Sequence, residues 1–200
     1  MPKKDAQGKL IPVPVLKIKY KDIFDIKEFY EALHDWLMDN EWRDADEGND
    51  HWESYYAERT TGGGAKEIWI WWRLAKPVRY APYLRYYLDI DFHGLGILPV
   101  EIVNDGRKMK VHKGELEMKI KGAIELVYTS KFKENVVLRN LERIFTKKIY
   151  TVQSEREKEL YQELHVLYNF IKQWFKLKRY LPYEEKKSFY PSQAWPSHQK

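Results

Sequence analysis

Three side chains that can bind a metal ion or transfer a proton occupy alternate positions of the chain: Asp89, Asp91 and His93. Alternate residues of a β-strand point to the same face, so a strand here would hold these side chains together. Two carboxylates beside a histidine can ligate a divalent metal or act as a general acid and base. The same alternation marks the polar side of a half-exposed strand, and we favour that simpler interpretation. We therefore predict no metal, no cofactor and no catalytic residue, with catalysis as the weakest alternative.

Other short motifs of ligand binding are incomplete. The acidic stretch DADEGND, from Asp44, resembles a calcium-binding loop, but Gly48 comes one residue early and position twelve is Tyr55 rather than glutamate. The stretch TGGG at 61–64 lacks the Lys-Ser/Thr pair of a phosphate-binding loop and lies between two predicted strands. The sequence contains no cysteine, which excludes disulfides, thiolate metal sites and cysteine nucleophiles.

The composition is that of one aromatic-rich domain. The 200 residues are enough for a single core, and aromatic residues make up 16% of them. No run approaches the ~20 apolar residues that span a bilayer, and the N-terminus lacks the apolar segment of a signal peptide. We therefore expect a soluble, cytoplasmic protein. Abundant Lys and Glu with few Asn and Gln point to a hot habitat.

Charge is unevenly distributed along the chain. Residues 39–58 carry a net charge of −7, whereas 107–121, 131–148 and 172–187 each carry +4. Lysine and arginine give salt-dependent affinity for phosphates and nearby rings can stack on bases, so a nucleic-acid surface is one interpretation. An anionic membrane surface and plain solvated faces are the others. The candidate nucleic-acid residues are Arg107, Lys108, Lys110, Lys113, Lys176, Lys178 and Arg179.

Hydrophobic periodicity predicts the elements that hold these side chains. Alternation indicates a first strand over 13–20, and Asp25 with Glu28 marks the start of a helix that ends near Asn40. Gly122, inside the last predicted strand, indicates a bend or bulge. Six consecutive strands, separated by turn signals such as TTGGG, GLG and NDG, follow the helix at 52–59, 66–75, 83–93, 98–103, 107–112 and 115–128.

After the last strand the apolar period changes from 2 to 3.6. This stripe predicts either two helices, with Ser154 and Glu157 capping the second, or one bent helix over 133–177. We expect a flexible N-terminal segment, a single α+β domain and an irregular aromatic and basic tail, over 1–10, 11–178 and 179–200.

The order strand, helix, six strands and long helix resembles the helix-grip fold of the START-like (polyketide cyclase) superfamily, over roughly residues 13–175. The resemblance lies in the order of elements, because this superfamily has no short diagnostic motif, and the usual second short helix is missing. It implies a curved antiparallel sheet of about six to seven strands packed on an N-terminal helix and a long C-terminal helical region. It also implies an apolar ligand between sheet and helix. A plain α+β sandwich without a cavity is the alternative.

The stretch KEIWIWWRL, over 66–74, places three tryptophans within four residues and is apolar on both faces of a strand. Cross-strand pairs each contribute roughly 0.2–1 kcal/mol, so they favour one register with the preceding strand. In that register two opposite-charge pairs and one aromatic pair share a face, namely Arg59–Glu67, Glu53–Arg73 and Tyr55–Trp71. The core face then carries Trp52, Tyr56, Ile68, Ile70, Trp72 and Leu74.

The register between the predicted strands 66–75 and 83–93 follows from the same kind of cross-strand pairs. Opposing Arg73 to Arg85 is unfavourable. We therefore expect the pairs Arg73–Tyr87, Trp71–Asp89, Trp69–Asp91 and Glu67–His93. Contiguous exposed aromatic residues indicate a partner, a ligand or a covering segment such as the tail with Phe189, Tyr190 and Trp195. This second face forms a patch, bordered by Arg73, of Tyr55, Trp69, Trp71, Tyr87, Asp89, Asp91 and His93.

Three functions remain open. The favoured one is a non-catalytic protein that holds an apolar or aromatic small molecule between the sheet and the C-terminal helix. Its pocket, of ~300–1,000 Å³, is expected to be lined by Trp52, Tyr56, Trp72, Tyr86 and Phe92. The second is a basic nucleic-acid or ribonucleoprotein-binding module, which requires the three basic segments to converge on one surface. The third is an assembly protein, including a homo-oligomer, that uses the face of Trp69 and Trp71 as its interface.

Overall fold

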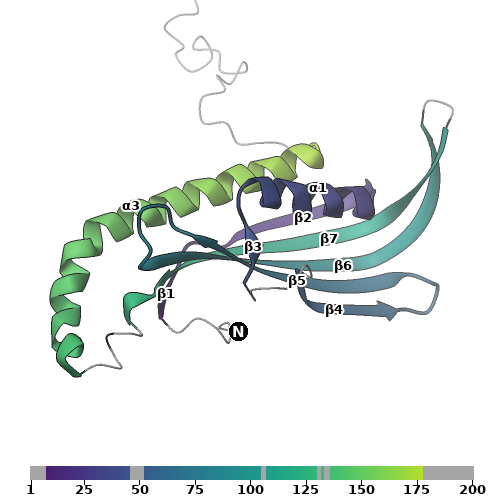
Figure 1. Ribbon diagram of the computed structural model, residues 1–200. Helices are drawn as coiled ribbons and strands as arrows, with labels where there is room; N and C mark the ends of the chain where they lie inside the picture. The colour runs from purple at the N-terminus through teal and green to yellow at the C-terminus, as the bar shows by residue number, and fades with distance from the viewer. Residues whose placement is uncertain (1–7, 46–51, 105–106, 130–131, 133–135, 178–200) are drawn as a thin grey trace, which may run out of the picture.

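The computed structural model describes residues 8–45, 52–104, 107–129, 132 and 136–177. Seven strands form a curved, unclosed antiparallel sheet, and the helices α1 (Ile26–Asp39) and α3 (Val136–Trp174) lie on one of its faces (Figure 1). This architecture confirms the predicted α+β class and is compatible with a helix-grip layout. Within these residues no helix is both long and apolar enough to cross a membrane.

The sheet has the order β1-β7-β6-β5-β3, with β2 also paired to β7 and β4 also paired to β5. The first strand begins inside the segment for which the sequence predicts flexibility, and residues 179–200 lie outside the described part. The strands are β1 (Lys9–Pro12), β2 (Leu16–Phe24), β3 (Arg43–Asp44), β4 (Glu53–Thr60), β5 (Lys66–Pro77), β6 (Leu84–Asn104) and β7 (Arg107–Leu126).

Helix α1 begins and ends with side-chain and backbone caps. The Asp25 carboxylate accepts hydrogen bonds from the first-turn amides, as the capping signal predicts. At the other end the amide of Glu41 donates to the Met38 carbonyl at 3.1 Å and that of Trp42 to the Leu37 carbonyl at 3.0 Å. These two bonds form a Schellman motif, which places Glu41 in the left-handed region at φ 66°. Glutamate thus occupies a position where glycine is usual.

Helix α3 is one continuous helix of 39 residues, which confirms the single-helix alternative. Ser154 lies inside it, so the predicted cap is wrong. The segment contains neither glycine nor proline, so nothing in it interrupts the backbone hydrogen bonds. The helix curves along the sheet (Figure 1), and its C-terminal half buries a stripe that consists of Leu160, Leu164, Leu167 and Ile171.

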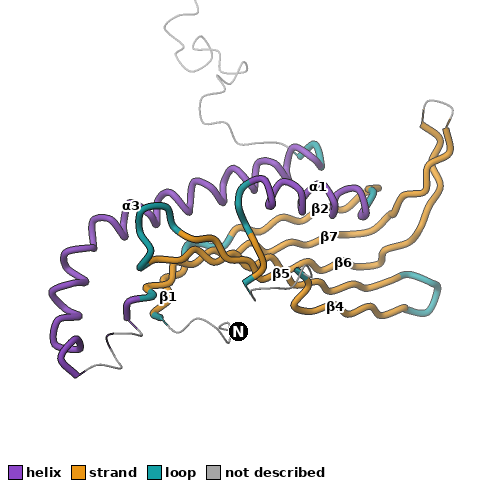
Figure 2. Tube along the Cα trace, in the orientation of Figure 1, coloured by secondary structure: helices purple, strands orange, loops and turns teal. Residues whose placement is uncertain are grey.

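The strands predicted at 83–93 and 98–103 are one strand, β6, and those at 107–112 and 115–128 are one strand, β7. Gly96 has φ 60° and lies at a bulge where the register shifts between Leu95 and Leu98, so this glycine bends the strand without ending it. The resulting hairpin extends past both helices at one end of the molecule (Figure 2).

The register of β7 with β1 and β2 shifts by one residue between the pairs Pro12–Ala123 and Leu16–Ile120, on the side away from β6. Gly122 lies at this irregularity and also at a point of close contact between sheet and helix. Its pairing with Leu88 of β6 is part of an unbroken register. A Cβ atom at this position would lie 2.5 Å from Leu164 Cδ1 and 2.9 Å from Val13 Cγ2. A side chain at this position would therefore press against Leu164 and Val13, so glycine favours the close packing of α3 on β7.

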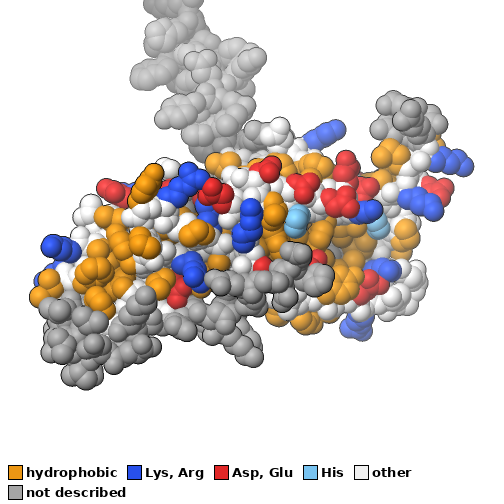
Figure 3. All heavy atoms as spheres, in the orientation of Figure 1, with side chains coloured by type: hydrophobic (Ala, Val, Ile, Leu, Met, Phe, Trp, Pro, Cys, Tyr) orange, Lys and Arg blue, Asp and Glu red, His pale blue; other side chains and the backbone are white. Residues whose placement is uncertain are grey.

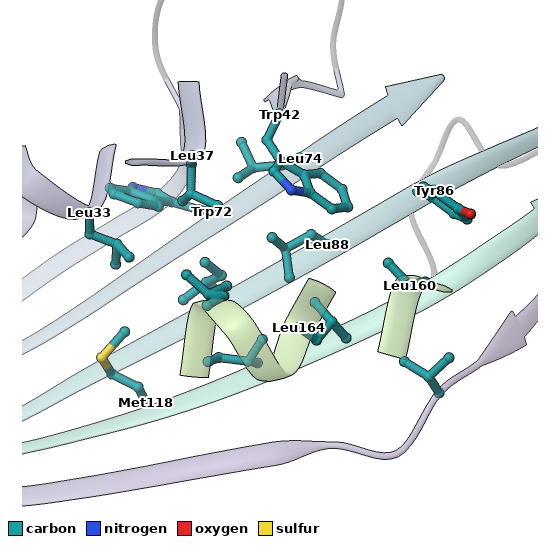
Figure 4. Packing of buried hydrophobic residues seen from close by; sticks show 14 of the residues in the cluster. Leu33, Leu37, Trp42, Trp72, Leu74, Tyr86, Leu88, Met118, Leu160 and Leu164 are labelled. Atoms are coloured by element: carbon teal, nitrogen blue, oxygen red, sulfur yellow. The ribbon is translucent and has the colours of Figure 1, made fainter. Parts of the chain in front are cut away.

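The core lies between the helices and the sheet and is closely packed (Figure 4). Trp72, Leu88 and Ile120 have no exposed surface. The indole nitrogen of Trp72 donates to the Tyr30 hydroxyl at 2.8 Å, so the buried polar atom of this side chain is satisfied.

Candidate functional site

The face of the sheet turned away from the helices carries the exposed tryptophans of β5. Trp71 is 39% exposed and Trp69 is half-buried, whereas Trp72 on the opposite face is completely buried. This division of the tryptophans agrees with the face assignment made from the sequence. Tyr55, on the neighbouring strand β4, is 43% exposed.

The register between β4 and β5 follows the prediction except at one end. Arg59 pairs with Glu67 and Tyr55 with Trp71, as expected. The predicted Glu53–Arg73 pair is wrong, because a bulge at Ser54 moves Glu53 opposite Trp72. The Glu53 side chain then lies on the helix side, where its carboxylate accepts a hydrogen bond from the Tyr30 hydroxyl.

The register between β5 and β6 differs from the prediction by two residues. The observed pairs are Trp69–His93, Trp71–Asp91 and Arg73–Asp89. A shift of two leaves every side chain on its predicted face, so the hydrophobic pattern does not distinguish the two registers. The observed register sets Arg73 opposite a carboxylate instead of Tyr87, which is the more favourable cross-strand pair.

Four rings on this face stack in two pairs. Tyr55 and Trp71 have ring centroids 4.3 Å apart with 30° between their planes, and Trp69 and His93 lie 5.2 Å apart at 16°. We call Tyr55, Trp69, Trp71 and His93 the aromatic platform. The Arg73 guanidinium carbon lies 5.3 Å from the Trp71 ring centroid, a cation–π contact at the border of the platform.

The charged residues beside the platform neutralise one another. Arg73 contacts Asp91 at 2.7 Å and Asp89 at 3.8 Å, and Lys121 also binds the Asp91 carboxylate. His93 Nε2 lies 3.0 Å from a Glu67 carboxylate oxygen. Burial would raise the pKa of Asp91, but the hydrogen bond from Lys121 and the charge of Arg73 outweigh it and hold that pKa below its ordinary value. The Asp89–Asp91–His93 row is therefore part of an ion-pair network.

No group of three or more His, Asp or Glu side chains in the described ranges is arranged to hold a metal ion. Tyr87, which the sequence assigns to the exposed patch, is buried. Its hydroxyl donates to Glu125 Oε2 at 3.0 Å, and Glu125 Oε1 accepts from the Gly8 amide at 2.8 Å. Burial raises the pKa of Tyr87. Glu125 thus links Tyr87 to the start of β1, and the sequence contains no signal for that contact.

The predicted ligand-binding residues pack against one another in the core. Trp72 has ring centroids 5.5 Å from Trp52 and 5.0 Å from Phe92, and all three side chains are at most 5% exposed. The Tyr86 hydroxyl donates to the Arg156 carbonyl of α3 at 3.2 Å. Tyr56 lies apart on β4 and is 58% exposed. Four of the five predicted ligand-binding residues thus belong to the core, and Tyr56 does not.

The basic segments do not share one surface. Lys108, Lys110 and Lys113 lie on the projecting β6–β7 hairpin, whereas the start of α3 lies at the opposite end of the molecule (Figure 1). Lys176 follows the C-terminal end of α3, and Lys178 and Arg179 fall outside the described residues. The predicted convergence of the three basic segments is therefore wrong for the part of them that the structure describes.

A groove that the sequence does not indicate lies between the end of β7 and the first half of α3. Its volume is about 350 Å³, and Figure 3 shows hydrophobic side chains gathered at this end of the molecule. Its lining comes from three elements far apart in the chain, so no local sequence pattern predicts the groove. The lining residues are Lys9, Leu126, Tyr128, Thr129, Ile144, Thr146 and Lys147.

Comparison of the chain with the profiles of protein families and with curated proteins finds no match in either set.

Proposed function

We propose that this protein is a non-catalytic assembly protein that binds a protein partner through the aromatic platform. The observation that carries the proposal is the stacked pair Tyr55–Trp71, which is 43% and 39% exposed on the sheet face that the helices leave open. An exposed aromatic cluster of this kind on a soluble domain usually marks an interaction site.

The composition of the platform fits a protein partner. Interfaces between proteins combine an aromatic centre with a polar rim, and tryptophan, tyrosine and arginine carry most of their binding energy. Here Trp71 and Tyr55 form the centre, and Arg73 with its two carboxylate partners forms part of the rim. Because those charges already neutralise one another, the rim offers little net field to attract a polyanion.

The geometry of the rings supports the same partner class. Tyr55 and Trp71 stack on each other, so no slot remains between them for a nucleobase or a sugar ring. The two rings already contact each other in the free chain, and a surface pre-organised in this way loses less conformational entropy on binding.

Site-specific photo-crosslinking tests this proposal. The full chain carries p-benzoylphenylalanine in place of Trp71, and a matched variant carries it in place of Tyr150, which is 64% exposed on α3. After irradiation in extract from the protein's own cells, we expect a protease-sensitive adduct at position 71 and none at position 150. The adduct should disappear when Trp69→Ser is added and persist when Tyr80→Ser is added, since Tyr80 is 96% exposed and outside the platform. A nuclease-sensitive adduct, or equal labelling at both positions, would refute the proposal.

A second candidate function rests on the groove beside α3. The START-like resemblance implies an apolar ligand between sheet and C-terminal helix, and the groove lies in that place with Leu126 and Tyr128 as its apolar floor. Lys9 and Lys147 at its border would suit an amphiphile with an anionic head group.

Native mass spectrometry of the purified protein tests the second candidate. A bound amphiphile should be retained by the native chain and lost in Ile144→Asp, which places a charge in the groove. Tyr150→Asp is the matched control, because Ile144 and Tyr150 lie on the same helix and are 63% and 64% exposed. A native chain without adduct, or an adduct that survives Ile144→Asp, counts against a ligand in the groove.

A further inference from the structure

Strand β4 is the outermost strand beside β5 (Figure 1), and among the described residues no strand pairs with its outer side. Seven of its eight residues are exposed. An uncovered edge offers a row of unpaired backbone N–H and C=O groups to another strand. Tyr55 belongs to this strand, so whatever pairs with the edge also borders the aromatic platform.

The hairpin fixes which backbone groups of β4 point outward. The Thr61 amide donates to the Ala65 carbonyl at 2.8 Å, next to the Thr60–Lys66 pair. Hydrogen-bonded and non-bonded pairs alternate in an antiparallel ladder, so Ala57 bonds inward to β5. The residues that direct their N–H and C=O groups away from the sheet are therefore Tyr56, Glu58 and Thr60.

We propose that two copies of the chain associate by antiparallel pairing of their β4 strands about a two-fold axis at Ala57. This places a second copy beside the aromatic platform, in contact with Tyr55, so it rests on the proposed function. The pairing sets Tyr56 opposite Glu58 of the second copy and Tyr55 opposite Arg59 of the second copy. Each of these pairs occurs twice, because a two-fold interface repeats every contact.

Charge and geometry favour this register. Tyr56 and Glu58 already share a hydrogen bond within one chain at 3.0 Å, and Arg59 can pack on the ring of Tyr55 of the second copy. No like charges oppose each other, and the bulge at Ser54 falls at the end of the new ladder. A shift that places Tyr56 on the axis brings the bulge inside the ladder and removes the pairing of Tyr55 with Arg59.

The other edge of the sheet is unsuited to the same association. Lys17, Lys19 and Lys21 of β2 alternate along it and are exposed. Self-pairing of β2 would bring lysines together, and edge lysines are a common means of preventing strand addition. Pairing through β4 instead joins the two platforms, because Tyr55 and Trp71 of each copy lie on the same face on either side of the axis.

Cysteine crosslinking tests the inference directly, since the chain contains no cysteine of its own. Ala57→Cys places two thiols at a non-hydrogen-bonded pair on the axis, where Cα atoms lie about 4.5 Å apart and a disulfide can form. We expect mild oxidation to crosslink most of Ala57→Cys and little of Arg59→Cys, whose partner in this register is Tyr55. Failure of Ala57→Cys to crosslink, or preferential crosslinking of Tyr56→Cys, would overturn the proposed pairing.

A second measurement does not depend on oxidation. Glu58→Pro removes an outward N–H group without touching the ladder to β5, and proline is tolerated on edge strands. In sedimentation velocity we expect dimers for the native chain and for Glu58→Ala, and monomers for Glu58→Pro, with unchanged circular dichroism. A native chain that stays monomeric at its highest soluble concentration would contradict the proposed dimer.

The two proposals fail in different ways. A polypeptide other than this chain crosslinked at position 71, with no disulfide at Ala57→Cys, leaves the proposed function in place and removes the second copy as its partner. A disulfide at Ala57→Cys with no polypeptide adduct at position 71 supports the dimer and removes the platform as its contact surface.

Discussion

Replacing Gly122 by alanine should destabilise the protein through one defined contact. The new Cβ would lie 2.5 Å from Leu164 Cδ1 and 2.9 Å from Val13 Cγ2, whereas carbon atoms in contact are about 3.5–4.0 Å apart. Leu164 and Val13 are 1% and 3% exposed, so neither can move into solvent. Overpacking of this kind costs about 1–3 kcal/mol.

Two effects set the net magnitude. Gly122 is not in the left-handed region, so alanine fits the backbone. Alanine also lowers the conformational entropy of the unfolded chain, which stabilises the folded protein by about 0.4–1 kcal/mol. We therefore expect Gly122→Ala to lower the free energy of unfolding by about 1–2 kcal/mol. Leu164→Ala alone should cost about 2–5 kcal/mol, because it leaves a cavity under α3.

The double variant separates this contact from general loss of stability. With Leu164 shortened, the alanine at 122 has room, so the two changes together should cost at least about 1 kcal/mol less than their sum. Urea unfolding followed by tryptophan fluorescence and by circular dichroism gives the four free energies, and coincident transitions check two-state behaviour. Strictly additive costs, or a Gly122→Ala protein as stable as the native one, would show that α3 is not seated on β7 through this glycine.

Three further changes test the capping, the charge network and the face assignment. Glu41→Gly should be more stable than Glu41→Ala by about 1 kcal/mol. Both variants lose the exposed ion pair with Arg79, but only glycine adopts the left-handed backbone conformation without strain. Thermal or urea unfolding measures the difference in free energy. The pKa of Asp91 is lower in the folded chain, so its contribution to stability is complete above the ordinary aspartate value and is lost as pH falls through the folded pKa. Below about pH 4, the urea midpoint of Asp91→Asn should therefore fall less steeply with decreasing pH than that of the native chain. Equal slopes for the two proteins would contradict this expectation. Trp72→Phe should cost about 2–3 kcal/mol, because it leaves a void and removes the hydrogen bond that the Tyr30 hydroxyl accepts. Trp71→Phe should stay within about 0.5 kcal/mol, and equal costs would contradict the assignment of the two faces.

Features set by one local signal are predictable from this sequence. Asp25 caps α1 because its side chain lies within reach of the next amides, and the alternation of β5 separates Trp72 from Trp71 because strand geometry has a period of two. The long α3 follows from an uninterrupted apolar stripe, although the local capping signal at Ser154 competes with that interpretation.

Features that depend on distant partners are not predictable in this way. The shift of two residues between β5 and β6 keeps both faces unchanged, so only the side-chain partners of Arg73 and His93 distinguish it. Gly96 and Gly122 look like turn or bend signals, yet one marks a bulge and the other a contact with α3. Tyr87 is buried and bonded to Glu125, which also binds the Gly8 amide, and the sequence offers no signal for these contacts.

The pairing of β1 with β7 has a consequence for the order in which the chain acquires its structure. Gly8 and Glu125, which meet at this edge, are 117 positions apart, whereas β6 and β7 are joined by a short hairpin. Closing a long loop costs more chain entropy and slows folding, so we expect the β6–β7 hairpin to form first and β1 to join last. During synthesis the N-terminal strands leave the ribosome early but must wait for β7. Until then the apolar face of β2 is uncovered, and this interval is when the chain is most exposed to aggregation.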